Sequence, residues 1–457
     1  MAAKYDLIVV GAGPGGTAAA KVAVEKKLKV LMLERGKTPG DKNMSGSYLF
    51  RSICNELFPD FEKAEFHEGQ IRMGGIFFEW VLDNDEKRYG VVAKAGGDAM
   101  RDMMTVFRNE SDIWIANQAV KAGAEIKTAL ATDLIWEIKT GENARVKGVI
   151  TDAGSFEAPV TIDASGLNSI LAQRSGLARW GTDKVQLAVK YIYKLDPEVL
   201  RKRMATYFDS DGVETDWGCM PTMAGSTPES WGAHCVGCPG RGIINIVVYQ
   251  TLKEVVKARV NIHQRGQWLV KQPPYSQLLE GAEFIYCNFH MLATNDLVGY
   301  VAKSYLPGLI LVGDAGGFAC PPDNFGANVA QWQGRMAAEL AIEMKAKKDY
   351  SEAMFAKYEE NWRNSWVGED DVHEMNFLLR GGGVQNIMTC LDNVMSTAFK
   401  QKFNNTSYPS IIMGAIPKFL PALPALVEAP YAMKQVAAVA VKKVSGLMGV
   451  LGMGTGK

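Results

Sequence analysis

Three glycines near the start of the chain, together with a later acidic residue, form the pattern with the clearest chemistry. Gly11, Gly13 and Gly16 follow a short apolar run at 6–10 in G-x-G-x-x-G spacing, and Glu34 ends a second apolar run. The first glycine permits a tight turn, the second lets the backbone approach a pyrophosphate, and the third lets helix and strand pack closely. Glu34 can accept hydrogen bonds from a ribose diol. We therefore predict that this stretch binds a dinucleotide.

A second pattern, much later in the chain, bears on which dinucleotide is bound. Gly313 and Asp314 end an apolar run, so a strand there would place one carboxylate at the carboxyl-end crevice of a parallel sheet. That carboxylate could bind the ribityl chain of a flavin. The helix expected to follow would aim the N–H groups of Gly326, Ala327 and Asn328 at a nearby anion. This arrangement suits the N1–C2=O edge of a reduced flavin, so we predict FAD.

The elements that must position these residues are of two kinds. An N-terminal βαβ unit is expected, with a helix over Thr17–Lys27 and a strand over Leu28–Leu33. The strand-like segments Val185–Lys194 and Gly242–Gln250 instead suit an antiparallel sheet that covers the flavin. The predicted fold class is therefore α/β plus α+β.

We divide the chain into three parts. A discontinuous Rossmann-like FAD-binding domain takes residues 1–175 and 290–345, and an antiparallel-sheet substrate domain takes 176–289. Residues 346–457 form a helical region whose tail, from Pro409, is strongly apolar, interrupted by prolines and basic. That tail is expected to contact a membrane surface, where its lysines meet anionic lipid; the alternatives are packing on the core and docking a partner subunit.

Composition narrows the functional class. The chain has 457 residues, 47% of them hydrophobic, which is enough for a large core. Its 50 basic and 50 acidic residues leave no net charge, which argues against a nucleic-acid partner. The seven cysteines are irregularly spaced, which favours a reducing, cytoplasmic setting. We expect no membrane-spanning helix, because no clean apolar run is long enough.

Four stretches resemble the electron-transfer-flavoprotein:quinone oxidoreductases, within the FAD superfamily that includes geranylgeranyl reductases and para-hydroxybenzoate-hydroxylase-like proteins. They are the N-terminal βαβ unit, GDKNMSGSYLF, MTVFRNESDIWIANQAVKAGAEI, and VGDAGG with the helix that follows. The resemblance implies that the second stretch passes the flavin ring and that the third supplies an arginine contact. The cofactor contacts expected in addition to the two glycine patterns are Arg35, Lys42, Asn43, Ser45, Arg108 and Ala131.

Two departures from these families refine the expectation. Geranylgeranyl reductases usually carry a cysteine where this chain has Asn43-Met44-Ser45, which weighs against prenyl reduction. Fused quinone oxidoreductases carry a C-terminal iron–sulfur region, but after Cys320 this chain has only Cys390. It therefore resembles the bacterial members whose iron–sulfur part is a separate ferredoxin-like subunit.

Two further sites have both a chemical and a structural interpretation. Cys235 and Cys238 could serve a cluster or a redox pair, but the usual C-x-x-C-x-x-C run of a four-iron cluster is missing. We therefore predict no metal in this chain, with these two cysteines as the remaining candidate ligands and a simple turn between strands as the alternative. His290 is the candidate catalytic residue; it could donate a proton to a quinone or flavin, or be a hydrogen-bonded structural residue.

The resemblance implies an FAD-dependent oxidoreductase that passes electrons from an electron-transfer flavoprotein, directly or through a ferredoxin-like subunit, to a membrane quinone. The residues leave two alternatives open: an FAD-dependent reductase of isoprenoid double bonds, and a flavin-bearing assembly subunit of a larger electron-transfer complex. The expected location is the cytoplasm, with peripheral attachment to the cytoplasmic membrane through the C-terminal region.

Overall fold

The structure is a computed structural model, and the residues that it describes fall into several ranges. These are 5–41, 46–67, 72–82, 87–94, 103–141, 144–177, 185–205, 217–225, 231–272, 275–293, 303–318, 326–365 and 367. Apart from Arg363, the last residue of helix α11 (Glu352–Arg363), the elements described below lie in one compact unit, which spans Met1–Asn295 and Val301–Trp362.

A six-stranded sheet carries the N-terminal glycine turn. In spatial order its strands are β17 (Tyr305–Leu306), β18 (Leu309–Leu311), β11 (Val160–Asp163), β1 (Leu7–Val10), β2 (Val30–Glu34) and β7 (Glu125–Thr128). The five strands from β18 to β7 pair in parallel, and β17 adds an antiparallel edge. Because β1 is buried on both faces, all four of its residues are apolar and buried.

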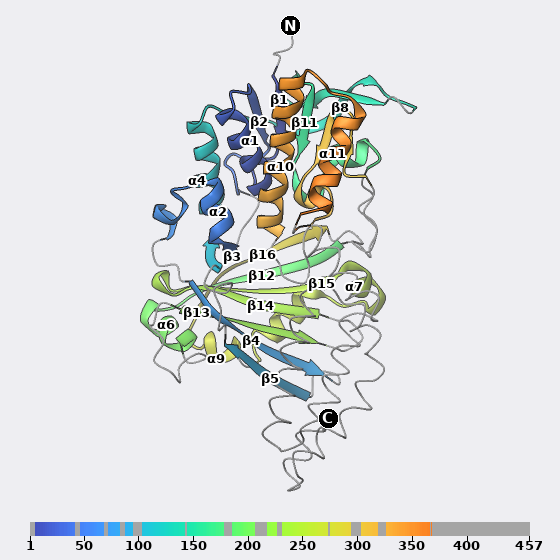
Figure 1. The fold of residues 1–457 in the computed structure, drawn as a ribbon. Coiled ribbons are helices and arrows are strands. Elements are labelled where there is room, and N and C mark those ends of the chain that lie inside the picture. Colours follow the sequence, from blue (N-terminus) through green and yellow to red (C-terminus); the bar gives the residue numbers. More distant parts are fainter. Residues whose placement is uncertain are drawn as a thin grey trace, which may run out of the picture. The chain divides into compact units, whose positions relative to one another are not determined.

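The two faces of this sheet are covered differently (Figure 1). Helices α1 (Pro14–Glu25) and α10 (Gly326–Lys347) pack together on one face, with α4 (Arg108–Lys121) beside α1. A three-stranded antiparallel sheet covers the other, and it shares a core with Ile8 and Val10 of β1. Its strands are β10 (Gly154–Glu157), β9 (Arg145–Thr151) and β8 (Ala131–Ile138).

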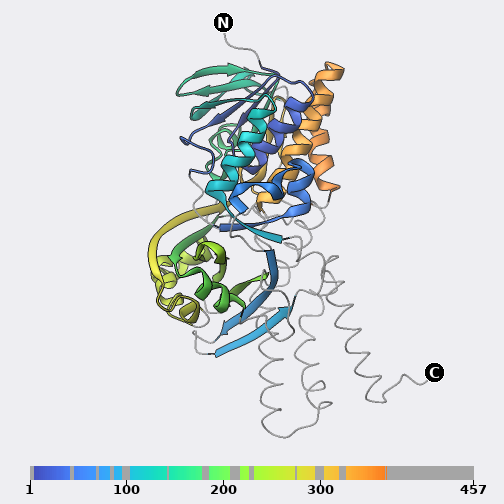
Figure 2. The ribbon, with the colours of Figure 1, turned by 90° about the vertical axis from the view of Figure 1, so that its left-hand side faces the viewer.

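A nine-stranded, mostly antiparallel sheet forms the second half of the unit (Figure 2). Its spatial order is β16 (Glu283–Ala293), β12 (Val185–Lys194), β15 (Ile243–Thr251), β14 (Trp231–Cys238), β13 (Trp217–Gly225), β4 (Arg72–Leu82), β6 (Met103–Phe107) and β3 (Gly46–Phe50), with β5 (Lys87–Lys94) paired to β4. One face buries Val189, Tyr191 and Ile246 with Leu269 and Tyr275. This buried face explains the alternation of apolar residues in β12.

The remaining helices border these sheets. They are α2 (Arg51–Leu57), α5 (Ile170–Arg174), α6 (Pro197–Ala205), α7 (Leu252–Ala258), α8 (Ile262–Leu269), α9 (Tyr275–Leu278) and α11 (Glu352–Arg363). The 3₁₀ turns are η1 (Phe61–Lys63), η2 (Glu65–His67), η3 (Gly166–Asn168), η5 (Pro239–Arg241) and η6 (Gly313–Ala315). In the part of the chain that the structure describes, none of the helices combines the length and apolar character needed to cross a membrane.

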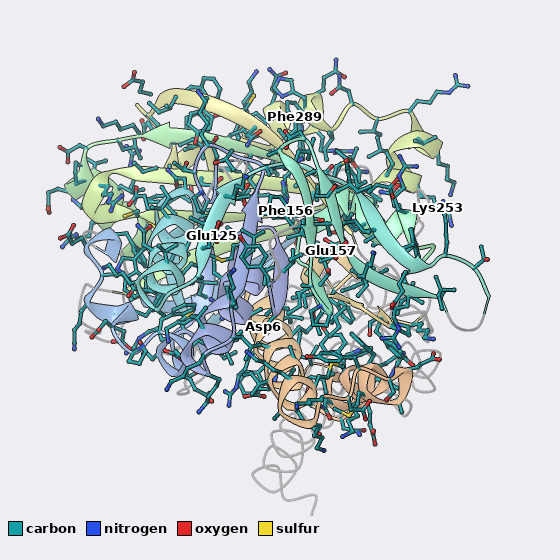
Figure 3. The ribbon with its side chains drawn as sticks, turned by 90° about the horizontal axis from the view of Figure 1, so that it is seen from above. Asp6, Glu125, Phe156, Glu157, Lys253 and Phe289 are labelled. Atoms are coloured by element: carbon teal, nitrogen blue, oxygen red, sulfur yellow. The ribbon has the colours of Figure 1, made fainter. Side chains whose placement is uncertain are left out.

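Polar contacts close the amino-end edge of the six-stranded sheet, which is the end away from the glycine turn (Figure 3). The Lys345 ammonium donates to Asp6 at 2.6 Å, which ties α10 to the start of β1. The Tyr5 hydroxyl donates to Glu125 at 2.8 Å, and the Tyr5 ring packs edge-on against Phe156. These contacts leave the carboxyl-end edge as the side of the sheet available for a ligand.

The predicted α/β plus α+β fold class is confirmed by the parallel sheet with its helices and by the separate antiparallel sheets. The strand predicted at Val185–Lys194 has those bounds, and the one predicted at Gly242–Gln250 is shifted by one residue. The domain boundaries at 1–175 with 290–345, 176–289 and 346–457 stay predictions. The tail from Pro409 lies outside the described residues.

Candidate flavin site

The glycine turn after β1 has the geometry that its spacing predicts. Gly11 has φ of 99°, in the left-handed region that glycine adopts without strain. A Cβ on Gly16 would overlap the carbonyl oxygen of Gly11, so only glycine lets α1 approach the turn this closely. A Cβ on Gly13 would meet nothing within 4 Å. The turn therefore needs Gly11 and Gly16 for packing, whereas Gly13 borders open space in which a phosphate could approach the backbone.

The Glu34 carboxylate at the end of β2 is held by two backbone groups. The N–H of Ala12 donates to one oxygen at 2.9 Å, and the N–H of Gly36 donates to the other at 2.7 Å. Both bonds fix the carboxylate next to the glycine turn. Because a carboxylate oxygen accepts more than one hydrogen bond, Glu34 keeps acceptor capacity for a diol.

A pocket opens beside Glu34 at the carboxyl ends of β1 and β2, enclosing about 480 Å³ that includes space open to solvent. Four of the predicted cofactor residues line it, namely Gly11, Glu34, Arg35 and Ala131. The Arg35 guanidinium donates to the side-chain oxygen of Asn168 at 2.8 and 2.9 Å when that amide is oriented to satisfy its neighbours. The pocket thus combines a diol acceptor, a cation and apolar walls.

Ser165 and Asn168 also line the pocket, although neither is among the predicted cofactor contacts. They follow β11, whose last residue, Asp163, is fully buried. Asp163 accepts from the Ser165 hydroxyl at 2.6 Å and from the N–H of Ala172 at 3.2 Å, while burial raises the pKa of its carboxyl group. The signal in the sequence is an apolar strand ending in Asp-Ala-Ser-Gly, which places a third turn at the same edge of the sheet.

The Asp314 turn lies at the end of β18, and its carboxyl group is in a desolvated place. Burial raises the pKa of Asp314 to about 6, although the nearby charge of Arg108 acts to lower it. Gly313 has φ of 61°, and its N–H donates to the side chain of Gln333 at 2.9 Å. The turn is thereby fixed to α10, and the parallel pairing of β18 with β11 puts Asp314 at the carboxyl-end edge of the sheet.

Arg108 reaches this region from the first residue of α4. Its guanidinium donates twice to Asp112, at 2.8 Å in each bond, and only 1% of the Asp112 side chain is exposed. Burial acts to lower the pKa of Arg108, but the charges of Asp112 and Asp314 raise it above its ordinary value. Arg108 is therefore a fixed, permanent cation close to Asp314.

The start of α10 lies next to β3. Gly326 and Ala327 are half-buried, and Asn328 is fully buried. The Asn328 side chain accepts from the N–H of Phe50 at 2.9 Å and donates to Gln331 at 3.0 Å. The side chain of Asn328 thus joins β3 to α10. The groups with which this helix can bind an anion are therefore the backbone N–H groups of its first turn.

The expected contacts Lys42, Asn43 and Ser45 lie outside the described residues. The chain is described again from Gly46, which pairs with Phe107, the residue before Arg108. These three contacts stay predictions.

His290 lies on β16, which runs next to the η3 and η6 turns of the cofactor edge. Burial, followed by the positive charges of Lys190, Arg108 and Arg35, lowers the pKa of His290 to about 3. Its imidazole is therefore neutral at ordinary pH and can offer one N–H and one ring nitrogen to a ligand. The catalytic role predicted for His290 stays a prediction.

Cys235 and Cys238 are both buried on β14. Cys235 packs in the core of the nine-stranded sheet, and positions three apart on a strand point to opposite faces. Burial raises the pKa of Cys238 to about 11, which keeps the thiol protonated rather than as the thiolate that binds metal. Among the described residues, no three His, Cys, Asp or Glu side chains gather as a metal site would require.

Comparison with known proteins identifies the family. Residues 6–256 match the family model described as FAD dependent oxidoreductase. Protein FixC of Azotobacter vinelandii is 28% identical over 81% of this chain and 83% of its own. A probable electron transfer flavoprotein-quinone oxidoreductase of Escherichia coli K12, YdiS, is 28% identical over 81% of this chain and 84% of its own. The resemblance seen in the four sequence stretches is therefore confirmed.

A solved structure with the same fold comes from Thermoplasma acidophilum and is described as geranylgeranyl bacteriochlorophyll reductase-like. It superposes with a TM-score of 0.68, at 21% identity, over 93% of this chain and 99% of its own. At this identity the likeness concerns the fold.

Proposed function

The chain belongs to the FAD-dependent oxidoreductase family, and from this premise we propose that it passes electrons from an electron-transfer flavoprotein to a membrane quinone. The observation that carries the proposal is the meeting of the glycine turn, Glu34 and the Asp314 turn at one edge of the sheet, in a chain whose relatives include YdiS and FixC. When bound there, the flavin supplies the acceptance and release of electrons.

The residues of the site fit the parts of FAD in order. Glu34 accepts from the ribose diol, and the backbone at Gly13, where a Cβ would meet open space, faces the pyrophosphate. Arg35, Ala131 and Asn168 enclose the adenosine end in the pocket. This fit rests on shape and donor chemistry, because each part of the ligand meets a group able to bind it.

Toward the redox-active ring, Asp314 binds the ribityl chain and the first turn of α10 faces the N1–C2=O edge. Arg108 adds a permanent positive charge on the same side, held in place by Asp112. A fixed cation and a helix N-terminus both favour negative charge on the ring, so these groups make the bound flavin easier to reduce.

The partners follow from the same proposal. An electron-transfer flavoprotein donates the electrons, directly or through a ferredoxin-like subunit that carries the iron–sulfur cluster. The quinone approaches the ring from the nine-stranded sheet. The apolar, basic C-terminal region from Pro409 holds the protein on the cytoplasmic face of the membrane.

An anaerobic reconstitution tests the proposal. The FAD-loaded protein is mixed with a reduced electron-transfer flavoprotein, with and without a ferredoxin-like partner, and the flavin absorbance is followed; a short-chain quinone is then added. We expect bleaching by the donor and recovery of the yellow colour with quinone. The Glu34→Ala variant should show neither because it lacks FAD, whereas Glu137→Ala, an exposed acid on β8, should behave as the wild type.

Two results would contradict the proposal. The first is a flavin that no electron-transfer flavoprotein reduces in either mixture. The second is a reduced flavin that quinone does not reoxidise but that saturates an isoprenoid double bond, which would instead identify a prenyl reductase.

A further inference from the structure

One face of the nine-stranded sheet carries three polar side chains, and this face is turned toward the cofactor edge of the six-stranded sheet. Lys190 on β12 pairs with Asn288 on β16, and Ala188 pairs with His290. Directly paired residues and residues two apart on a strand share a face, so Lys190, Asn288 and His290 lie on the same side of the sheet. The opposite side holds Val189 and Tyr191 in the apolar core under α8 and α9.

This polar face is the one directed at the flavin site. Strand β16 runs next to η6, which contains Asp314, and next to η3, which lines the adenosine pocket. Arg108 provides a second link, since its charge acts on Asp314, on His290 and on Lys190. Lys190, His290 and Asp314 therefore all lie near this one cation, beside the space assigned to the ring in the proposed function.

The charges around Lys190 oppose its protonation. Burial, and then the positive charge of Arg108, lower the pKa of Lys190 to about 8. Among the described residues, the titratable groups on this side include His290, which is neutral, Tyr249, which pairs with Ala188, and Tyr286, which pairs with Ile192. The charge of Arg35 also acts on His290. Helix α8, which carries His263 and Arg265, packs on the opposite face through Ile262 and Leu269. A ligand that carries a negative charge in this space would raise the pKa of Lys190 and so favour its ammonium form.

We propose that Lys190 faces the flavin ring from β12 and that its amine, where it is neutral, takes up a proton when the ring is reduced. This inference rests on the proposed flavin site but not on the identity of donor or quinone. Where the Lys190 amine is neutral in the oxidised protein, two electrons from the donor and two protons from water are consumed: one proton ends on the flavin and the other on the amine, whose charge offsets the negative charge left on the ring. Where the amine already carries its proton, only the flavin proton is consumed. Reoxidation by an acceptor returns the electrons and protons that were taken up.

The midpoint potential of the bound flavin tests this assignment, because each proton taken up per two electrons contributes about 30 mV per pH unit. The potential is measured with redox dyes between about pH 7 and pH 10. For the wild type we expect a slope of about 30 mV per pH unit that steepens to about 60 mV above about pH 8.

Substitutions separate the role of the amine from that of bulk charge. Lys190→Met and Lys190→Arg should both keep the shallow slope of about 30 mV per pH unit throughout, because neither side chain titrates in this range. Of the two, Lys190→Arg should have the higher potential, since it keeps the positive charge. The matched control is Lys194→Met, an exposed lysine four residues along the same strand, which should steepen like the wild type.

Several outcomes would overturn the inference. One is a wild-type slope that never steepens; another is a Lys190→Met slope that steepens as before. A third is weaker FAD binding in both Lys190 variants with unchanged pH dependence, which would make Lys190 a phosphate contact. Because the potential needs only bound FAD, a protein that fails to react with flavoprotein or quinone can still confirm the role of Lys190, and each variant's FAD content shows that it has folded.

Discussion

The Arg108 guanidinium and the Asp112 carboxylate form a two-bond ion pair across one turn of α4, and the pair is nearly removed from water. Such a pair holds the cation at one position beside Asp314, whereas an arginine without a partner would adopt many side-chain conformations. Its burial also makes it costly to break, because an unpaired charge would stay in the interior.

Replacing Asp112 with Asn should therefore destabilise the protein by about 3 kcal/mol and weaken FAD binding. The matched control is Glu339→Gln, which breaks another Arg–acid pair at the same helical spacing, Arg335–Glu339, but on an exposed surface. That control should change stability by less than about 1 kcal/mol. Urea unfolding of both variants measures the difference; equal effects would mean that the burial of Asp112 is unimportant.

The glycines of the first turn should separate folding from cofactor binding. Gly16→Ala should destabilise the apoprotein, because the new Cβ overlaps the carbonyl oxygen of Gly11. Gly13→Ala should leave the apoprotein nearly as stable, because its Cβ enters open space, yet it should lower FAD affinity at least about tenfold by occupying the phosphate's place. Thermal unfolding and FAD titration of each apoprotein test this, and full FAD affinity in Gly13→Ala would contradict it.

Glu34→Ala should lose most of its bound FAD. The substitution removes the ribose acceptor and also leaves the N–H groups of Ala12 and Gly36 without their partner, so we expect a loss of about 2 kcal/mol or more in FAD binding. Fluorescence titration of the apoprotein with FAD measures the change. A dissociation constant within about twofold of the wild type would show that Glu34 is not a ribose ligand.

Asp314 should give the apoprotein an unusual dependence of stability on pH. Its pKa is raised to about 6 in the folded state, so the folded protein holds the proton more tightly than the unfolded chain does. Stability should therefore fall as the pH rises from about 4 to about 6. Asp314→Asn should remove this fall and make the apoprotein more stable at neutral pH, by about 2 kcal/mol, while weakening FAD retention.

Asp6 supplies a control of opposite sign. The N–H of Lys29 and the Lys345 ammonium lower the pKa of Asp6 despite its partial burial, so its stabilising effect is present at neutral pH and is lost on acidification through the lowered pKa. Asp6→Asn should thus reduce stability at neutral pH. Melting temperatures of the wild-type, Asp314→Asn and Asp6→Asn apoproteins, measured across this pH range, test both expectations. Parallel curves for Asp314→Asn and the wild type would refute the raised pKa of Asp314.

The sequence by itself determined the parts of the site that depend on local geometry. Glycine spacing, two apolar runs and a terminal acid specify a βαβ turn, because a tight turn and a close helix approach restrict which residues fit. For the same reason the residue pattern alone locates the Gly313–Asp314 turn and the helix from Gly326. The strand at Val185–Lys194 is visible in the sequence because one buried face imposes an alternating pattern.

Only the tertiary structure decided which distant residues share a space. Asn168 joins the pocket because β11 lies beside β1, a parallel pairing that no local pattern encodes. Lys190 reads in the sequence as an ordinary lysine of an amphipathic strand, and its lowered pKa arises from burial and from Arg108, which belongs to another element. Electrostatic effects of this kind depend on distances between side chains and on the exclusion of water, and both are set by how the sheets pack rather than by spacing along the chain.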